Sequence, residues 1–186
     1  TRRLPSKTPH DMLQTKERVK RTKNAEQALS SLMRLCARAE RSSGDARRLM
    51  ATWGVPEQDR EKVLQRLKAE RFIDDERYAS AFVREKVSLG GWGEYKIRSA
   101  LRRKGIAEDI IARALQQISP RQSAEQLAMR LARKLKTVKY KSKYDLKNKL
   151  IRYGLSLGYT MEAVIPQVEE LIHDIKTEEE CDDFLF

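Results

Sequence analysis

The stretch GGWGEYKIRSALRRKGI, residues 90 to 106, places basic side chains at helical spacing beside an aromatic ring. If a helix runs from about Glu94 to Lys104, the apolar positions 97, 100 and 101 face inward and the basic positions face outward. The outward residues form two strips, with Tyr95, Arg98 and Arg102 on one and Lys96, Ser99 and Arg103 on the next. Cations at this spacing repel one another, so the pattern predicts a surface that binds an anionic partner.

Trp92 lies in the glycine-rich turn before this helix, and it has two interpretations. The indole either packs as a staple over the start of the helix or stays exposed as an anchor for a protein partner. The two are compatible if one face of the ring stays open.

A second basic segment is KLKTVKYKSKYDLKNK, residues 134 to 149. Lysines neutralise phosphates, and the interleaved Tyr140 and Tyr144 can stack on bases, so this segment is a candidate nucleic-acid surface. A solvated loop explains the same residues equally well. The candidate nucleic-acid-binding residues are Arg130, Arg133, Lys134, Lys136, Lys139, Tyr140, Lys141, Lys143 and Lys147.

The charge of the whole chain is uneven. The net charge is +12 over 186 residues. Residues 1–24 hold eight Lys and Arg against two Asp and Glu, residues 121–160 hold eleven against two, and residues 161–186 hold one against nine. Such asymmetry favours a polyanion, an acidic protein surface or both as partner, with a solvated charged face as the plain alternative.

Enzyme chemistry finds little support. The chain has two Cys and two His, far apart in sequence, which is too few for a zinc site, and it lacks a GxxxxGK phosphate loop. Asp74 and Asp75 are better explained as helix caps than as metal ligands. Cys36 is expected to be a buried, inert thiol, without a disulfide to Cys181. No cofactor, metal site or catalytic residue is therefore predicted.

Nothing in the sequence predicts a membrane protein. No apolar run approaches the roughly 20 residues that span a bilayer, and the first residues lack the apolar centre of a secretory signal. We therefore expect a cytoplasmic monomer without a membrane partner.

The elements that must position these residues are helices arranged in a repeat. Apolar spacing is helical throughout, and a pattern of helix, helix, glycine turn, helix recurs three times. Gly54, Gly105 and Gly158 coincide at offsets of 51 and 53 residues, each followed by an apolar residue. The predicted fold is all-α, an elongated curved array of three tandem three-helix repeats resembling helix-turn-helix units. The predicted parts are a basic arm (1–24), three repeats (25–73, 74–120 and 121–173) and an acidic tail (174–186).

Capping residues predict where the first helix of each repeat begins. Asn24 with Gln27 suits the first repeat, Asp74 and Asp75 the second, and Ser123 with Gln126 the third, whose inward face would end at Val138. Gly154 falls inside a predicted helix, where glycine costs about 1 kcal/mol relative to alanine.

Two helices joined by a glycine turn also occur in DNA-reading modules, where the helix after the turn enters the major groove. Here that helix, EDIIARALQQI, begins with Glu108 and Asp109 and carries Arg113 as its single cation. Base readout in the major groove is therefore not expected.

Residues 71–106 resemble the signature of the RecX family of bacterial recombinase regulators. The matching motifs are FIDDERYA, then GWG, then KIRSALRRKGI, and the similar organisation covers about residues 25–172. The basic arm and the acidic tail lie outside the resemblance, and the Lys-rich connection at 136–149 is a local elaboration.

The resemblance implies a regulator without enzymatic activity that binds the RecA filament on single-stranded DNA and inhibits its ATPase, strand-exchange and co-protease activities. Whether the protein also binds double-stranded DNA is not decided by the resemblance. The implied partner-binding residues, taken with the outer strips above, are Trp92, Gly93, Tyr95, Lys96, Arg98, Arg102, Arg103 and Lys104. The alternative is a helical protein that binds DNA without contacting the recombinase; a nuclease is disfavoured because metal ligands are missing.

Overall fold

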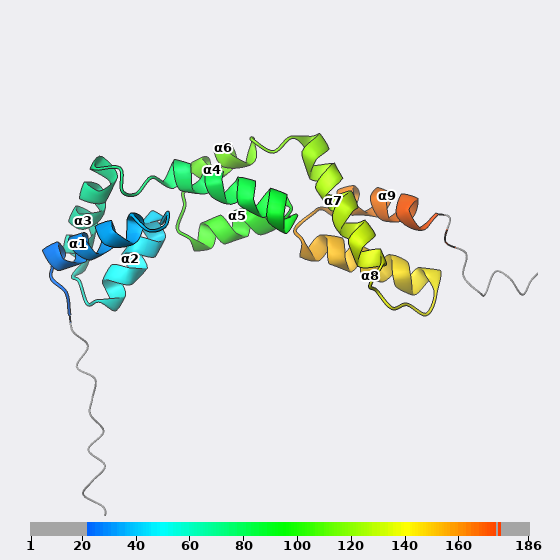
Figure 1. The fold of residues 1–186 in the computed structure, drawn as a ribbon, viewed down its shortest axis with the longest axis horizontal. Helices are drawn as coiled ribbons and strands as arrows, with labels where there is room; N and C mark the ends of the chain where they lie inside the picture. Colours follow the sequence, from blue (N-terminus) through cyan, green and yellow to red (C-terminus); the bar gives the residue numbers. More distant parts are fainter. Residues whose placement is uncertain (1–21, 174, 176–186) are drawn as a thin grey trace, which may run out of the picture.

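The computed structural model describes residues 22–173 and residue 175, and within them every regular element is a helix. Three successive helices recur three times, as the sequence predicts (Figure 1). The helices are α1 (Ala25–Cys36), α2 (Ser43–Thr52), α3 (Glu57–Ala69), α4 (Asp75–Glu85), α5 (Glu94–Arg103), α6 (Glu108–Leu115), α7 (Pro120–Leu135), α8 (Lys143–Ser156) and α9 (Met161–Ile172). A π-helical turn, η2 (Lys86–Gly90), extends α4.

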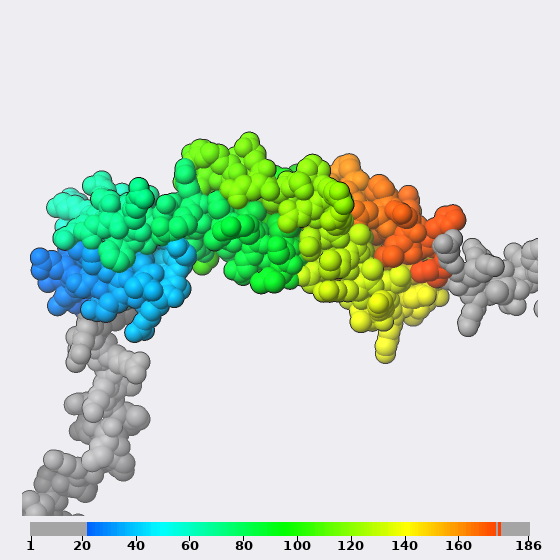
Figure 2. Space-filling model, turned by 45° about the horizontal axis from the view of Figure 1, so that its top comes forward, coloured from blue at the N-terminus to red at the C-terminus, as the bar shows by residue number. Residues whose placement is uncertain are grey.

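Each set of three helices encloses its own hydrophobic core. The three clusters are centred on Leu32 and Leu67, on Ile97 and Ile111, and on Leu131 and Val168. The three units lie end to end as an elongated, bent array (Figures 1 and 2). The residue limits assigned to each repeat stay a prediction, and most of the arm and tail, including Cys181, lies outside the described residues.

The three glycine turns have the predicted geometry. Gly54, Gly105 and Gly158 have φ of 72°, 73° and 91°, the left-handed region in which a side chain is strained. The apolar residue after each glycine is buried and packs back over the turn. The second helix of every repeat therefore ends in the same way.

The predicted caps are partly right. The capping box of Asn24 and Gln27 is present, and Asp74 accepts hydrogen bonds from the N–H groups of Glu76 and Arg77. The predicted start of the third repeat's first helix at Ser123 is wrong: α7 begins one turn earlier, because Ser119 accepts from the Gln122 N–H and Pro120 suits the first helical position.

Two further expectations are corrected. Val138 lies beyond the end of α7 at Leu135, so it belongs to the connection rather than the helix. Gly154 is not a weak point, because a Cβ there would lie 2.7 Å from Val164 Cγ1 and 2.8 Å from Cγ2. The absent side chain lets α8 approach α9 closely.

Cys36 is half-buried rather than buried. Burial raises the pKa of its thiol, which favours the unreactive protonated form at neutral pH.

Candidate partner-binding face and inter-repeat joints

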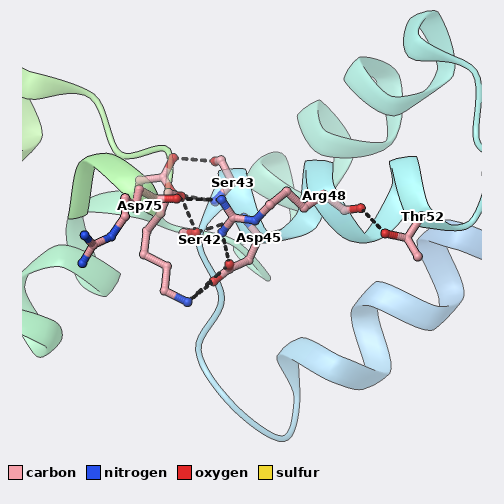
Figure 3. A network of polar contacts seen from close by, with 8 residues as sticks. Ser42, Ser43, Asp45, Arg48, Thr52 and Asp75 are labelled. Carbon is pink, nitrogen blue, oxygen red and sulfur yellow. Dashed lines mark hydrogen bonds and ion pairs between the residues drawn. The ribbon is translucent and has the colours of Figure 1, made fainter. Parts of the chain in front are cut away.

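The joint between the first and second repeats brings the start of α2 onto the end of α5 (Figure 3). The Ser42 hydroxyl donates to the Lys104 carbonyl oxygen at 2.7 Å, and the Lys104 ammonium pairs with Asp45 at 3.1 Å. Gly44 is required for this approach, since a Cβ there would lie 2.2 Å from the Lys104 carbonyl oxygen. Lys104 thus holds two repeats together, and its predicted contact with a partner stays a prediction.

Asp75 is the second anchor of this joint. Its carboxylate is 9% exposed and accepts hydrogen bonds from the Ser43 N–H, at 2.8 Å, and from the Ser43 hydroxyl. The ammonium of Lys68 lies 3.3 Å away and balances the charge. The predicted capping role therefore belongs to Asp74 alone, and Asp75 links repeats because its side chain turns back toward α2.

The joint between the second and third repeats uses the start of α5 and the end of α8. The N–H of Gly93 donates to the Leu157 carbonyl oxygen at 2.8 Å. The N–H of Tyr95 donates to the Gly158 carbonyl oxygen at 3.2 Å. A Cβ at Gly93 would lie 2.4 Å from the Gly158 oxygen. The Lys96 ammonium donates to the Ser156 carbonyl oxygen at 3.0 Å. Gly93 and Lys96 are thus joint residues.

The two joints are equivalent. Ser42 and Gly93 are the N-caps of α2 and α5, and Lys104 and Leu157 are the C-caps of α5 and α8. In each joint a helix N-terminus meets carbonyl groups at the C-terminus of the next repeat's second helix, so opposite partial charges face each other. α2, α5 and α8 consequently follow one another along the lower edge of the molecule in Figure 1.

Of the two interpretations of Trp92, the structure has the staple, in which the indole packs over the start of α5. The half-buried indole packs edge-on against Phe82, with ring centres 6.3 Å apart, within the core of the second repeat. The ammonium groups of Lys96 and Lys86 lie 4.7 Å and 5.5 Å from the ring centre, close enough for cation–π contacts with the indole.

Three predicted residues are left on the outer side of α5. Tyr95 is 66% exposed, Arg102 is exposed, and Arg103 is exposed with no ion pair within the described part of the chain. We call Tyr95, Arg102 and Arg103 the α5 face. Arg98 lies beside it but is only 26% exposed and is held between Glu94 and Glu108.

Acidic side chains already neutralise part of this positive charge. Glu108, the first residue of α6, pairs with Arg98 and, at 2.8 Å, with Arg102. The hydrogen bond from Arg102, with a further one from Arg98, lowers the pKa of the Glu108 carboxyl. Acidic side chains of the same chain therefore already relieve part of the repulsion, and binding of an anionic partner stays a prediction.

The predicted nucleic-acid residues divide into tied and free side chains. Arg130 reaches the Leu89 carbonyl oxygen at the second joint, and Lys134 lies over the Tyr153 ring. Lys143 donates to the His173 carbonyl oxygen and Lys147 pairs with Glu169. The exposed remainder without an ion pair in the described residues is Arg133, Lys136, Lys139 and Lys141, beside Tyr140, which is 40% exposed, and Tyr144, which is 77% exposed. We call these six residues the repeat-3 patch.

Two kinds of site find no support in the part of the chain that the structure describes. It contains no group of three or more His, Cys, Asp and Glu side chains able to hold a metal ion. None of its helices is long and apolar enough to cross a bilayer.

Known proteins share this arrangement of helices and these motifs. The family model of the second three-helix domain of RecX matches residues 74–115, the span from the Asp74 cap to the end of α6. A regulatory protein RecX from Clostridium botulinum is 32% identical over 122 residues, which are 64% of this chain and 57% of the relative. The chain belongs to the RecX family.

Further RecX proteins agree. One from Clostridium perfringens is 29% identical over 148 residues, 78% of this chain and 68% of the relative. A crystal structure of a regulatory protein RecX has a TM-score of 0.72 at 25% identity, covering 81% of this chain and 73% of that one. RecX from Lactobacillus salivarius, at 18% identity, shares the fold, with a TM-score of 0.70 and coverage of 79% and 96%. The chain spans between about half and two thirds of the curated relatives cited.

Much of the RecX signature in this chain serves the joints. Asp75 and Lys104 belong to the first joint, and Gly93 and Lys96 to the second. Sequence reasoning missed their counterparts Ser42 and Gly44, which lie in the first repeat outside the motif. The available signal was that Ser42 and Gly93 occupy equivalent positions before the second helix.

Proposed function

We propose that this RecX family member regulates the RecA recombinase filament on single-stranded DNA, and that it inhibits ATP hydrolysis, strand exchange and co-protease activity without being an enzyme. Membership of a family of regulatory proteins supports the regulatory part of the proposal. The observation that carries the choice of surface is the exposure of the α5 face.

Among the described residues, the side chains of the α5 face take no part in either joint, and only Arg102 has an ion pair, with Glu108 of the same repeat. Trp92, Gly93, Lys96 and Lys104 hold the molecule together, whereas Tyr95 reaches solvent next to the second joint and Arg103 next to the first. An exposed Tyr beside Arg side chains is the combination that most often contributes strongly to protein interfaces. We therefore assign the recombinase contact to Tyr95, Arg102 and Arg103.

The proposed mechanism follows from the shape. A bent row of three rigid units can lie along a helical groove and contact adjacent recombinase subunits at once. Such binding would lock the subunit interface at which ATP is turned over, and would block extension at a filament end. Positive charge on the α5 face would pair with acidic groove residues and speed association.

Recombinase ATPase activity on single-stranded DNA tests this assignment. We expect Arg102→Glu/Arg103→Glu to weaken inhibition at least tenfold, because two charges are reversed at the contact. The matched control is Arg34→Glu/Arg38→Glu, which makes the same charge change on exposed arginines of the first repeat. Undiminished inhibition by the folded α5 variant would exclude this face.

A second candidate is binding of DNA without contact to the recombinase, and the repeat-3 patch favours it. Four cations that have no ion pair in the described residues lie beside Tyr140 and Tyr144, so the patch combines phosphate neutralisation with base stacking. Titration of single-stranded DNA alone and of recombinase alone, each at two salt concentrations, separates the two functions. For DNA, Lys136→Gln/Lys139→Gln/Lys141→Gln is expected to reduce the slope of log affinity against log salt by about 2.

A further inference from the structure

The end of α2 matches the ends of α5 and α8, yet no further repeat docks on it in the described structure. Trp53 is the C-cap of α2, as Lys104 and Leu157 are for α5 and α8, and Gly54 has the same left-handed φ as Gly105 and Gly158. The sequence therefore builds a third acceptor turn, equivalent to the two that hold the repeats together.

Residues just before α1 cover this third acceptor turn. The N–H of Lys23 donates to the Trp53 carbonyl oxygen at 2.9 Å, as Gly93 does to Leu157 in the second joint. The Thr22 methyl group lies against Gly54, where a Cβ would approach it to 2.9 Å. The Lys23 ammonium lies 3.6 Å from the centre of the Trp53 ring and donates to the Ser31 hydroxyl. Residues 22 and 23 thus take the place at this acceptor turn that the start of a second helix takes in the two joints.

The opposite end of the array carries an unused donor. Ser142, the N-cap of α8, accepts from the Asp145 N–H, as Ser42 accepts from the Asp45 N–H in α2. In the first joint the Ser42 hydroxyl also donates to a carbonyl oxygen, whereas the Ser142 hydroxyl has no such acceptor among the described residues.

The length of α8 points this donor in nearly the same direction, relative to its repeat, as Ser42 points in the first repeat. Ser142 precedes the C-cap Leu157 by fifteen positions, against eleven between Ser42 and Trp53. The four extra residues rotate the helix by about 400°, which is about 40° more than one full turn. The first turn of α8 therefore faces nearly the same way, relative to its own repeat, as the first turn of α2.

We propose that the two ends of the array are complementary halves of a joint, and that Thr22 and Lys23 block the acceptor half against the α8 end of a second copy of this chain. Uncovered, the acceptor at Trp53 would receive Ser142 of another copy, head to tail. Such an interface does not close on itself, so it would build open chains of copies. Residues 22 and 23 therefore keep the protein monomeric.

Sedimentation velocity of full-length variants tests the proposal. Lys23→Pro removes the N–H donor to Trp53, and we expect it to form a concentration-dependent series of oligomers. Lys23→Ala keeps the N–H while removing the ammonium contacts, and we expect it to stay monomeric like the wild type. Adding Ser142→Ala to Lys23→Pro removes the donor at the other end and should restore the monomer.

Two outcomes would overturn the proposal. One is a folded Lys23→Pro protein that stays monomeric, together with a monomeric chain that begins at Asn24 and so lacks the whole cover. The other is an assembly that persists unchanged when Ser142→Ala is added, because it would then arise from exposure of Trp53 rather than from the joint geometry.

Discussion

At the scale of single residues, Glu108 controls how much positive charge this RecX family member presents. Its carboxylate pairs with two arginines of α5, Arg98 and Arg102, while Arg103 stays without an ion pair in the described chain. The equivalent first residue of α3, Glu57, is exposed and has no such pair among the described residues. The same position therefore has different consequences in two repeats, because Arg47, the α2 residue equivalent to Arg98, pairs with Glu61 instead.

We predict that Glu108→Gln strengthens binding to the recombinase filament several-fold, because it frees the Arg102 guanidinium for an acidic partner and leaves Arg98 paired with Glu94 alone. Folding should change little, since the carboxylate is exposed. The measurement is the concentration needed for half-inhibition of the recombinase ATPase at low and high salt. Glu57→Gln removes the same charge elsewhere and should leave that concentration unchanged; an equal effect of both variants would mean that only net charge matters.

The ion pair at the first joint predicts a pH dependence. Burial alone would raise the pKa of the Asp45 carboxyl, but hydrogen bonds from Arg48 and Lys104 overcome this effect and hold the pKa below its usual value. A lowered folded-state pKa stabilises the protein above the unfolded pKa of about 4, and this contribution disappears as the pH falls through the folded value.

We therefore expect the difference in unfolding free energy between wild type and Asp45→Asn to be largest near neutral pH and to shrink below about pH 4. Urea unfolding at a series of pH values measures it. A difference that stays constant from about pH 7 to about pH 2 would show that the charge of Asp45 does not stabilise the joint.

At the scale of helices, glycine decides how closely neighbouring elements approach. Gly154 lies in the interior of α8, where its propensity alone suggests that alanine would stabilise the helix by about 1 kcal/mol. The structure reverses this expectation, because both methyl groups of the fully buried Val164 lie within 2.8 Å of the position that a Cβ would take. A β-branched side chain in a packed core has little freedom to move away.

We predict that Gly154→Ala destabilises the protein by about 1–3 kcal/mol, as overpacking of a core does. Val164→Ala alone should also destabilise it, by leaving a cavity. The double variant should be more stable than the sum of the two effects implies, because the new methyl group enters the space that valine leaves. Urea unfolding of the four proteins measures this coupling, and strict additivity would contradict the proposed clash.

The helices and turns were predictable because they depend on local sequence. The left-handed Gly105, the cap at Asn24 and the inward stripe of Ile97 and Leu101 follow from spacing and residue type alone, and the structure confirms them. The π-helical turn η2 and the earlier start of α7 were missed. For α7 the sequence offers two capping patterns of similar quality, Ser119 with Pro120 and Ser123 with Gln126, and the structure uses the earlier one.

The roles of the signature residues were harder to predict, because they depend on contacts between repeats. Asp75 looks like a cap until α2 is placed beside it, and Lys104 looks like one more outward cation until Asp45 is found across the joint. Contacts between residues about 30 and 60 positions apart leave no periodic pattern. The exposure of Tyr95 was predicted because the helical strip alone decides it.

At the scale of the whole molecule, two small joints set the curvature of the array. Each repeat has a separate core, so the angle between repeats depends on a few hydrogen bonds and on close backbone approach at Gly44 and Gly93. If the proposed function requires several recombinase subunits to be contacted at once, the joints matter more for inhibition than for the folding of any one repeat.

Gly93→Ala separates the effect of a joint on inhibition from its effect on the folding of one repeat. The backbone at Gly93 has φ of −82°, so alanine fits there, but its Cβ would lie 2.4 Å from the Gly158 carbonyl oxygen and would push the second and third repeats apart. We predict that helical content measured by circular dichroism changes little, while the radius of gyration in solution scattering shifts and inhibition of the recombinase falls at least tenfold.

Binding of single-stranded DNA by the repeat-3 patch should persist in this variant, because its residues lie within one repeat. Gly154→Ala is the matched control, since it adds the same methyl group inside the third repeat, against Val164 rather than across a joint. Full inhibition by Gly93→Ala, with an altered radius of gyration, would mean that the recombinase contact needs only one repeat and that the bend of the array has no part in it.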